Sequence, residues 1–188
     1  AALQYTELGW YIIPVWGARD GHCACPRGAQ CKDDATGHPI HDLVPNGLAD
    51  ATIDPDTIRS WWAQYPLAIP AVALVPSGLI AVEINDCDQE KLDALEAEYE
   101  PLPETLQLRR ACDRTELLFF STPSFQIKST FRGITIHSNG HIVLPPLSQT
   151  DASQNQWILG CAPGDLLVAE LPESWLEDLR RPSLSGRI

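Results

Sequence analysis

The sequence predicts an α/β domain of the α+β kind, in which a small sheet is packed against helices. Short apolar runs bounded by Gly, Pro and Asn have the length of buried strands, and the clearest covers residues 79–84. Other segments repeat apolar residues at helical spacing, and a chain of 188 residues can bury a core without disulfides. We therefore predict one domain over residues 1–180, followed by a tail or linker at 181–188.

The first half of the chain is expected to open with a helix over residues 1–8 and a strand over 10–16. A polar segment at 17–47 follows, which is too long for an ordinary connection. Asp54 and Pro55 then have the order of an N-cap and a first helical residue, so we expect a helix that stops before Pro66.

The second half is expected to contain more strands than helices. Two hairpins are predicted, one pairing residues 71–75 with 79–84 and one pairing 133–137 with 142–144, because turn-forming residues separate each pair. The remaining predicted elements are a helix capped near Asp86 and running to about residue 99, strands over 105–109, 116–121 and 157–159, and a closing helix over 172–179.

The net charge of −12, from 13 basic and 25 acidic residues, works against any broad grip on nucleic acid. Binding would need a local patch, for which the candidates are Arg109, Arg110, Arg114, Lys128 and Arg132. The pair Trp61 and Trp62 could stack on bases, but adjacent aromatic residues of a helix more often lie one in the core and one at its rim. Since no apolar run is long enough to span a membrane and the first residues lack the pattern of a leader, we expect a cytoplasmic protein.

Clustered Cys and His residues give the strongest local signal in the sequence. Cys23, Cys25, Cys31 and His38 lie within sixteen residues of one another and can close a tetrahedral zinc site. His22 and His41 are alternative nitrogen ligands, and the competing interpretation is a reduced loop with incidental Cys. A bound zinc ion would explain how so long a polar segment is ordered, and a site closed by four ligands is structural rather than catalytic.

A second constellation surrounds the predicted strand at 79–84. Glu83 and Asn85 point to the same side of the strand, an arrangement that can offer paired oxygen ligands to a divalent metal. Asp86 and Asp88 lie beyond the strand, where they are expected to be carboxylates at a helix N-terminus. His137 could bind a phosphate, although an unpartnered His is more often a plain surface residue.

Several stretches, in their order and spacing, resemble one protein family over nearly all of the chain: ALQYTELGWYIIPV, the Cys/His loop ending in GHP, NGLADATIDPDTIRSWWAQYP, ALVPSGLIAVEIND, LPETLQLRR, GITIHSNGHIVLPP and LPESWLEDL. The family is the bifunctional DNA primase/polymerase (prim-pol) N-terminal domain, a branch of the archaeo-eukaryotic primase superfamily found in replication proteins of bacteria, archaea, plasmids and phages. The resemblance implies an RRM-like sheet core, an N-terminal helix-strand unit and a zinc-binding loop. It also implies DNA primase and polymerase activity with Mg²⁺ or Mn²⁺.

The chain departs from the family at the positions that the resemblance marks as catalytic. Two acids separated by one residue are replaced by Glu83 and Asn85, and a third acid in a late strand is replaced by Thr135. The family's Gly-Gly-x-His, whose His is thought to meet the phosphates of the incoming nucleotide, corresponds to residues 113–116 and ends here in Glu116. One carboxylate, one amide and one hydroxyl supply too little negative charge to hold two metal ions.

We therefore expect a replication-associated primase/polymerase-like domain that has lost or weakened its nucleotidyl transferase activity and serves as a nucleic-acid, nucleotide or protein-binding module. Its partners would be single-stranded DNA or a primer-template, dNTP, or other replication proteins. One alternative is an active enzyme with a displaced metal set of Glu83, Asp86 and Glu116. Another is a protein-interaction scaffold that does not bind nucleic acid, which the acidic charge would fit.

Overall fold

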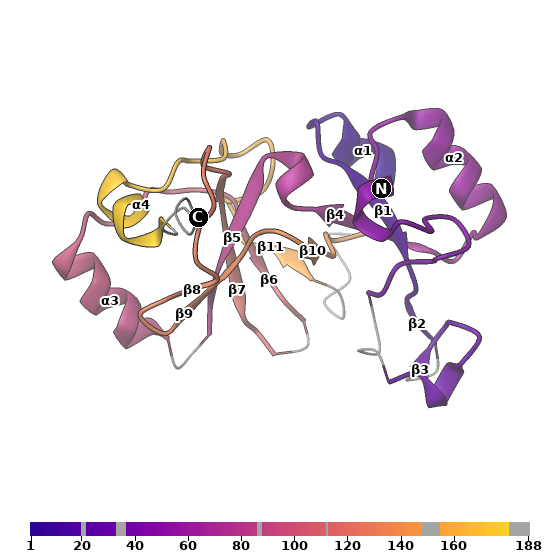
Figure 1. Ribbon diagram of the computed structural model, residues 1–188, viewed down its shortest axis with the longest axis horizontal. Coiled ribbons are helices and arrows are strands. Elements are labelled where there is room, and N and C mark those ends of the chain that lie inside the picture. The colour runs from indigo at the N-terminus through magenta and orange to yellow at the C-terminus, as the bar shows by residue number, and fades with distance from the viewer. Residues whose placement is uncertain (20–21, 33–36, 86–87, 112, 148–154, 181–188) are drawn as a thin grey trace, which may run out of the picture. The chain divides into compact units, whose positions relative to one another are not determined.

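A computed structural model describes residues 1–19, 22–32, 37–85, 88–111, 113–147 and 155–180. The chain forms two compact units, one of Ala1–Ser77 with Gly140–Ser148 and the other of Gly78–Asn139 with Gln149–Ile188. Helices and antiparallel strands are mixed in both units, so the predicted α/β class is confirmed (Figure 1). The predicted tail at 181–188 lies outside the described residues.

The first unit is built on a three-stranded antiparallel sheet in the order β1-β4-β10. These strands are β1 (Ile12–Val15), β4 (Ile69–Ala73) and β10 (Ile142–Val143). The unit also contains α1 (Ala2–Thr6), α2 (Pro55–Gln64), the short ribbon of β2 (Ala18–Arg19) and β3 (His22–Cys23), and three 3₁₀ turns, η1 (Gly28–Gln30), η2 (Gly47–Asp50) and η3 (Val75–Ser77).

Helix α2 forms where the sequence predicts it. The carboxylate of Asp54 accepts a hydrogen bond of 2.8 Å from the backbone N–H of Thr57, as an N-cap should. Trp61 is buried, whereas Trp62 is half-buried, so the prediction of one core and one rim position is confirmed.

The second unit contains a six-stranded antiparallel sheet in the order β11-β6-β7-β5-β9-β8. Its strands are β5 (Leu79–Ile84), β6 (Gln107–Arg109), β7 (Glu116–Ser121), β8 (Thr130–Phe131), β9 (Ile134–His137) and β11 (Gln156–Trp157). The helices among the described residues of this unit are α3 (Gln89–Glu98) and α4 (Glu173–Leu179). The hairpin between β8 and β9 turns through Arg132 and Gly133, whose φ angles of 47° and 89° suit a type I′ turn.

The main core of this unit lies between one face of the sheet and the two helices. Ile80, Val82 and Ile84 of β5 belong to a buried cluster with apolar residues of α3 and α4. Trp175 of α4 is fully buried and lies against Phe131 and Tyr99, with ring centroids 5.4 and 6.0 Å away. Strand alternation therefore leaves Glu83 on the opposite face of β5.

Both predicted hairpins are wrong. Strand β4 pairs with β1 and β10, whereas β5 pairs with β7 and β9, so the two strands of each expected hairpin belong to different sheets. The turns that the sequence marks after Ser77 and Asn139 are the places where the chain passes from one unit to the other. The helix predicted to start near Asp86 begins at Gln89 after Asp88, and Asp86 lies outside the described residues.

Candidate functional site

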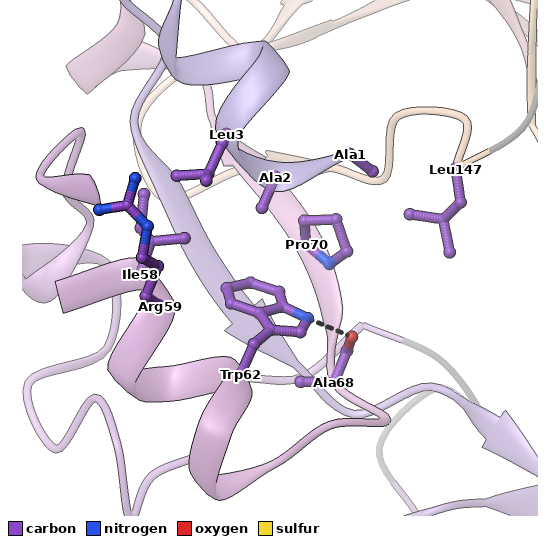
Figure 2. A pocket seen from close by; sticks show the side chains of 9 residues that line it. All are labelled: Ala1, Ala2, Leu3, Ile58, Arg59, Trp62, Ala68, Pro70 and Leu147. Carbon is purple, nitrogen blue, oxygen red and sulfur yellow. Dashed lines mark hydrogen bonds between the residues drawn. The ribbon is translucent and has the colours of Figure 1, made fainter. Parts of the chain in front are cut away.

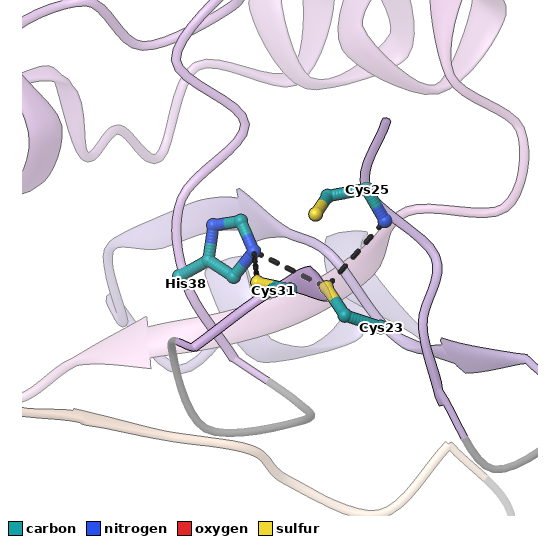
Figure 3. Close-up of side chains that lie close together, drawn as sticks. All are labelled: Cys23, Cys25, Cys31 and His38. Atoms are coloured by element: carbon teal, nitrogen blue, oxygen red, sulfur yellow. Dashed lines mark hydrogen bonds between the residues drawn. The ribbon is translucent and has the colours of Figure 1, made fainter. Parts of the chain in front are cut away.

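Four side chains converge in the long polar segment of the first unit. Cys23 lies on β3, Cys25 follows it, Cys31 ends η1, and His38 stands shortly before Ile40 (Figure 3). Their donor atoms all lie within 4.8 Å of one another, with His38 Nε2 at 3.2 Å from Cys23 Sγ and 3.6 Å from Cys31 Sγ. Cys23 and Cys25 are buried, so the cluster is partly shielded from water.

Backbone hydrogen bonds hold this cluster in place. The N–H of Ala24 donates to the carbonyl of Gly17 and the N–H of Cys31 donates to that of Gly28, at 2.9 and 3.0 Å. At the other end of the loop, the N–H of Trp16 donates to the carbonyl of His38 at 3.0 Å. The segment therefore returns to the end of β1, which brings His38 back to the three Cys residues.

The donor set fits a metal ion. Burial raises the pKa of the Cys25 thiol, but hydrogen bonds from the Arg27 backbone and from the three other donor side chains outweigh burial and lower that pKa to about 6. A thiolate is the form that ligates metal, so the cluster could hold a metal ion through three sulfurs and one imidazole nitrogen. His22 and His41, the alternative ligands, are exposed and do not belong to the cluster.

In the second unit, β5 lies between β7 and β9 and carries Glu83. The register places Glu83 directly opposite Leu117 of β7 and Thr135 of β9. His137, two residues after Thr135, lies on the same face of the sheet by strand alternation. Asn85 is half-buried just beyond the end of β5. The structure thus brings together Glu83, Thr135 and His137 on one face of the sheet. For Glu83 and Thr135, the family resemblance implies this proximity.

Both carboxylate oxygens of Glu83 have cationic or basic partners. Oε2 lies 2.5 Å from His137 Nε2, and Oε1 lies 3.4 Å from a terminal nitrogen of Arg110. The side chains are only 18%, 20% and 30% exposed, so these interactions are partly shielded from solvent. The sequence suggested Arg110 and His137 as binding residues but did not predict that they converge on Glu83.

Arg110 stands in the tight connection between β6 and β7. Its terminal nitrogen also lies 2.9 Å from Asp113 Oδ2. Burial raises the pKa of Asp113, but hydrogen bonds from Thr115 and the charge of Arg110 outweigh it and hold that pKa below its usual value. Arg110 Nε is buried and has no hydrogen-bond partner in the described part of the chain.

Glu116 is not brought next to Glu83. It pairs with Ile84 across β5 and β7, so it lies on the face of the sheet that the helices cover. Its carboxylate is 2.5 Å from a terminal nitrogen of Arg109, its cross-strand neighbour. Side-chain alternation along β7 explains why Glu116 and Glu83 lie on opposite faces, because Leu117, one residue later, shares the face of Glu83.

The other basic candidates are tied to different elements. Arg114 is exposed and has a positive φ of 60° in the connection between β6 and β7. The remaining ones have partners in the second unit: Arg132 with Glu98 at 2.7 Å and Lys128 with the backbone oxygen of Asp178 at 2.5 Å. Arg132 and Lys128 are thus engaged near α3 and α4 rather than beside Glu83.

The first unit also contains an apolar cavity of about 370 Å³. It is bordered by α1, α2 and the strand end at Pro70, and the indole N–H of Trp62 donates to the Ala68 carbonyl at 3.0 Å (Figure 2). Arg59 is the one charged side chain among the nine that line the cavity, and it pairs with Asp56 at 2.7 Å. None of the described helices in either unit is long and apolar enough to cross a membrane.

Comparison with known proteins identifies the family of the chain. A search of curated proteins gave no match. A family model for the N-terminal domain of bifunctional DNA primase/polymerases, in contrast, matches residues 2–174. The match includes the Cys/His loop and the strand of Glu83 and ends at the start of α4. The chain therefore belongs to the bifunctional DNA primase/polymerase N-terminal domain family.

Proposed function

We propose that this primase/polymerase-like replication domain has lost or weakened its nucleotidyl transferase activity and acts as a binding module for nucleic acid, nucleotide or protein. The observation that carries the proposal is the surroundings of Glu83. Its carboxylate lies beside His137 and Arg110, and its cross-strand neighbour at the position of the family's third acid is Thr135.

The number of anionic ligands limits metal binding at this place. Two-metal nucleotidyl transfer depends on several carboxylates that hold two divalent cations against a triphosphate. Here Glu83 is the one carboxylate among the three expected ligand positions, and Arg110 already sets a positive charge 3.4 Å from it. A Mg²⁺ or Mn²⁺ ion at this place would have to displace that guanidinium and would gain few anionic ligands in return.

The displaced metal set has less support. Glu116 would have to reach Glu83 from the opposite face of the sheet, and it is engaged by Arg109. Asp88, which follows β5 and precedes α3, is buried and forms an ion pair with Lys91. An active enzyme would therefore depend on Asp86, which lies outside the described residues.

We assign the Cys23, Cys25, Cys31 and His38 cluster to a structural zinc ion. Zinc is favoured over magnesium or calcium because thiolate and imidazole ligands suit a soft or borderline cation. The four protein ligands would leave no open position, so this ion would order the 17–47 insertion within a single domain over residues 1–180 and take no part in chemistry. We place the protein in the cytoplasm, where reduced thiols persist.

A primer-extension assay tests the proposal. Purified protein is given a primed template, dNTP and either Mg²⁺ or Mn²⁺, and we expect no extension above the level of a Glu83→Ala variant. A Glu98→Ala variant serves as a control, because Glu98 is an exposed acid on α3 whose removal changes the charge equally. Template-directed extension that Glu83→Ala abolishes and Glu98→Ala preserves would overturn the proposal.

The choice among binding roles needs a second measurement. Single-stranded DNA and dNTP are titrated at low salt, where electrostatic binding is strongest. Binding to either would support a nucleic-acid or nucleotide module. Absence of binding to both would favour the protein-interaction scaffold, which the charge of −12 fits.

A further inference from the structure

Glu83, Arg110 and His137 form an anion site that the chain itself occupies. One carboxylate oxygen of Glu83 meets the imidazole of His137 at 2.5 Å, and the other meets the guanidinium of Arg110 at 3.4 Å. A guanidinium and an imidazole that flank the two oxygens of one anion are also the groups that proteins use to bind phosphate. The geometry therefore has the character of an anion-binding site with a side chain as its ligand.

Arg110 is not used fully by its partners. Its contact with Glu83 is long for a charge-assisted hydrogen bond, and its Nε is buried with no hydrogen-bond partner among the described residues. An unsatisfied buried donor is costly, so an ion pair that served stability alone would be expected to satisfy this N–H. Spare donor capacity remains even though Asp113 also contacts the guanidinium.

The site is open enough to be reached. Arg110 is 30% exposed and His137 20% exposed, and Thr135 on the same face is exposed and carries a hydroxyl that can donate to an oxyanion. Glu83 is the group that would have to leave, since its negative charge repels an incoming phosphate. The site thus contains both the donors and an internal competitor.

We propose that Arg110 and His137 bind a phosphate group directly, without a divalent metal, and that Glu83 competes with the phosphate for them. This inference rests on the proposed function, because it names the ligand class of the binding module. Arg110 brings the positive charge that metal ions would supply at this face, His137 adds an imidazole nitrogen, and Glu83 changes from a metal ligand into an internal inhibitor. The phosphate comes from a nucleotide or from a nucleic-acid backbone.

The test measures binding in the presence of EDTA. Inorganic pyrophosphate is titrated into wild-type protein and into Glu83→Gln, which keeps the shape of the side chain and removes its charge. Loss of one charge-assisted contact corresponds to roughly tenfold or more in affinity, so Glu83→Gln should bind at least about tenfold more tightly than wild type. Adding Arg110→Gln to that variant should abolish the gain.

Glu98→Gln is the matched control. It removes the same charge from an exposed pair and releases another arginine, Arg132, so it reports any general gain in anion binding. An equal gain in Glu98→Gln and Glu83→Gln, or no gain in either, would overturn the inference. Wild-type protein supplies a measurement that needs no variant, because pyrophosphate in EDTA should shift the imidazole NMR signals of His137, and unchanged signals at saturating pyrophosphate would also overturn it.

Two further arms identify the source of the phosphate and separate this inference from the proposed function. Glu83→Gln is titrated with dNTP and with a short single-stranded oligonucleotide in EDTA, and the tighter ligand names the source. Metal-dependent primer extension by wild-type protein would refute the proposed loss of activity. Absence of extension together with absence of EDTA-resistant phosphate binding would refute this inference alone.

Discussion

Replacement of Cys23 by Ser tests the metal centre most directly. Cys23 is only 5% exposed, and its sulfur lies 3.2 Å from His38 Nε2 and 3.4 Å from the backbone N of Cys25. In a tetrahedral zinc site, bonds of about 2.3 Å to sulfur and 2.0 Å to nitrogen place neighbouring donor atoms roughly 3.5–3.8 Å apart. Small side-chain movements would therefore bring the donors to that geometry.

The expected size of the effect follows from the ligand count. Structural zinc sites have apparent binding free energies of about 10–16 kcal/mol, or about 2.5–4 kcal/mol for each of four ligands. Loss of one thiolate should then weaken zinc binding by roughly 10²- to 10³-fold, because 1.4 kcal/mol corresponds to a factor of ten. Unfolding of the first unit should begin at a lower temperature, since a bound ion would connect the two ends of its long loop.

The assay combines elemental analysis with competition against a chromophoric chelator. Wild-type protein should retain one zinc ion per chain, whereas Cys23→Ser should release its zinc to far weaker chelators. Cys161→Ser is the matched control, because Cys161 is a half-buried free cysteine outside the cluster. Zinc content that is far below one ion per chain in wild type, or equal retention in both variants, would refute the assignment.

Three further outcomes are expected for the second unit. Trp175→Ala should lower the free energy of unfolding by about 3–5 kcal/mol in urea titrations, because it removes a fully buried aromatic ring. A decrease below about 1 kcal/mol would contradict the described core. Arg132→Gly should unfold at a higher urea concentration than Arg132→Ala. Both variants lose the ion pair with Glu98, but only Gly tolerates the φ of 47° without strain. The reverse order of the two urea midpoints would contradict the positive φ described for this turn. The pKa of Asp113 is lower in the folded than in the unfolded chain, so its contribution to stability is present above its ordinary pKa and is lost as the pH falls through the folded value. Asp113→Asn should therefore weaken the dependence of the free energy of unfolding on acid pH. Identical pH profiles of stability for wild type and variant would contradict this expectation.

Local patterns predicted most elements because each depends on residues close in the chain. Residues 79–84 and 116–121 form strands with the predicted bounds, and Asp54 caps α2 as its sequence indicates. The same patterns predicted the wrong strand pairing at Ser77 and Asn139. A turn between two apolar runs looks alike whether the runs pair with each other or join separate sheets, and only long-range pairing distinguishes the two cases.

The Cys/His cluster could be predicted from the sequence because its four residues are close in the chain and their side chains have one shared chemistry. The family could be predicted as well, since it depends on residue identity and order.

The arrangement of the charges around Glu83, in contrast, depends on the tertiary structure. Antiparallel register sets His137 on the face of Glu83 and Glu116 on the other, and a tight connection returns Arg110 to the same carboxylate. A shift of one residue in either pairing would exchange the faces, and local patterns do not show which strands pair with one another. The surroundings of the carboxylate therefore follow from strand pairing between segments that lie far apart in the chain.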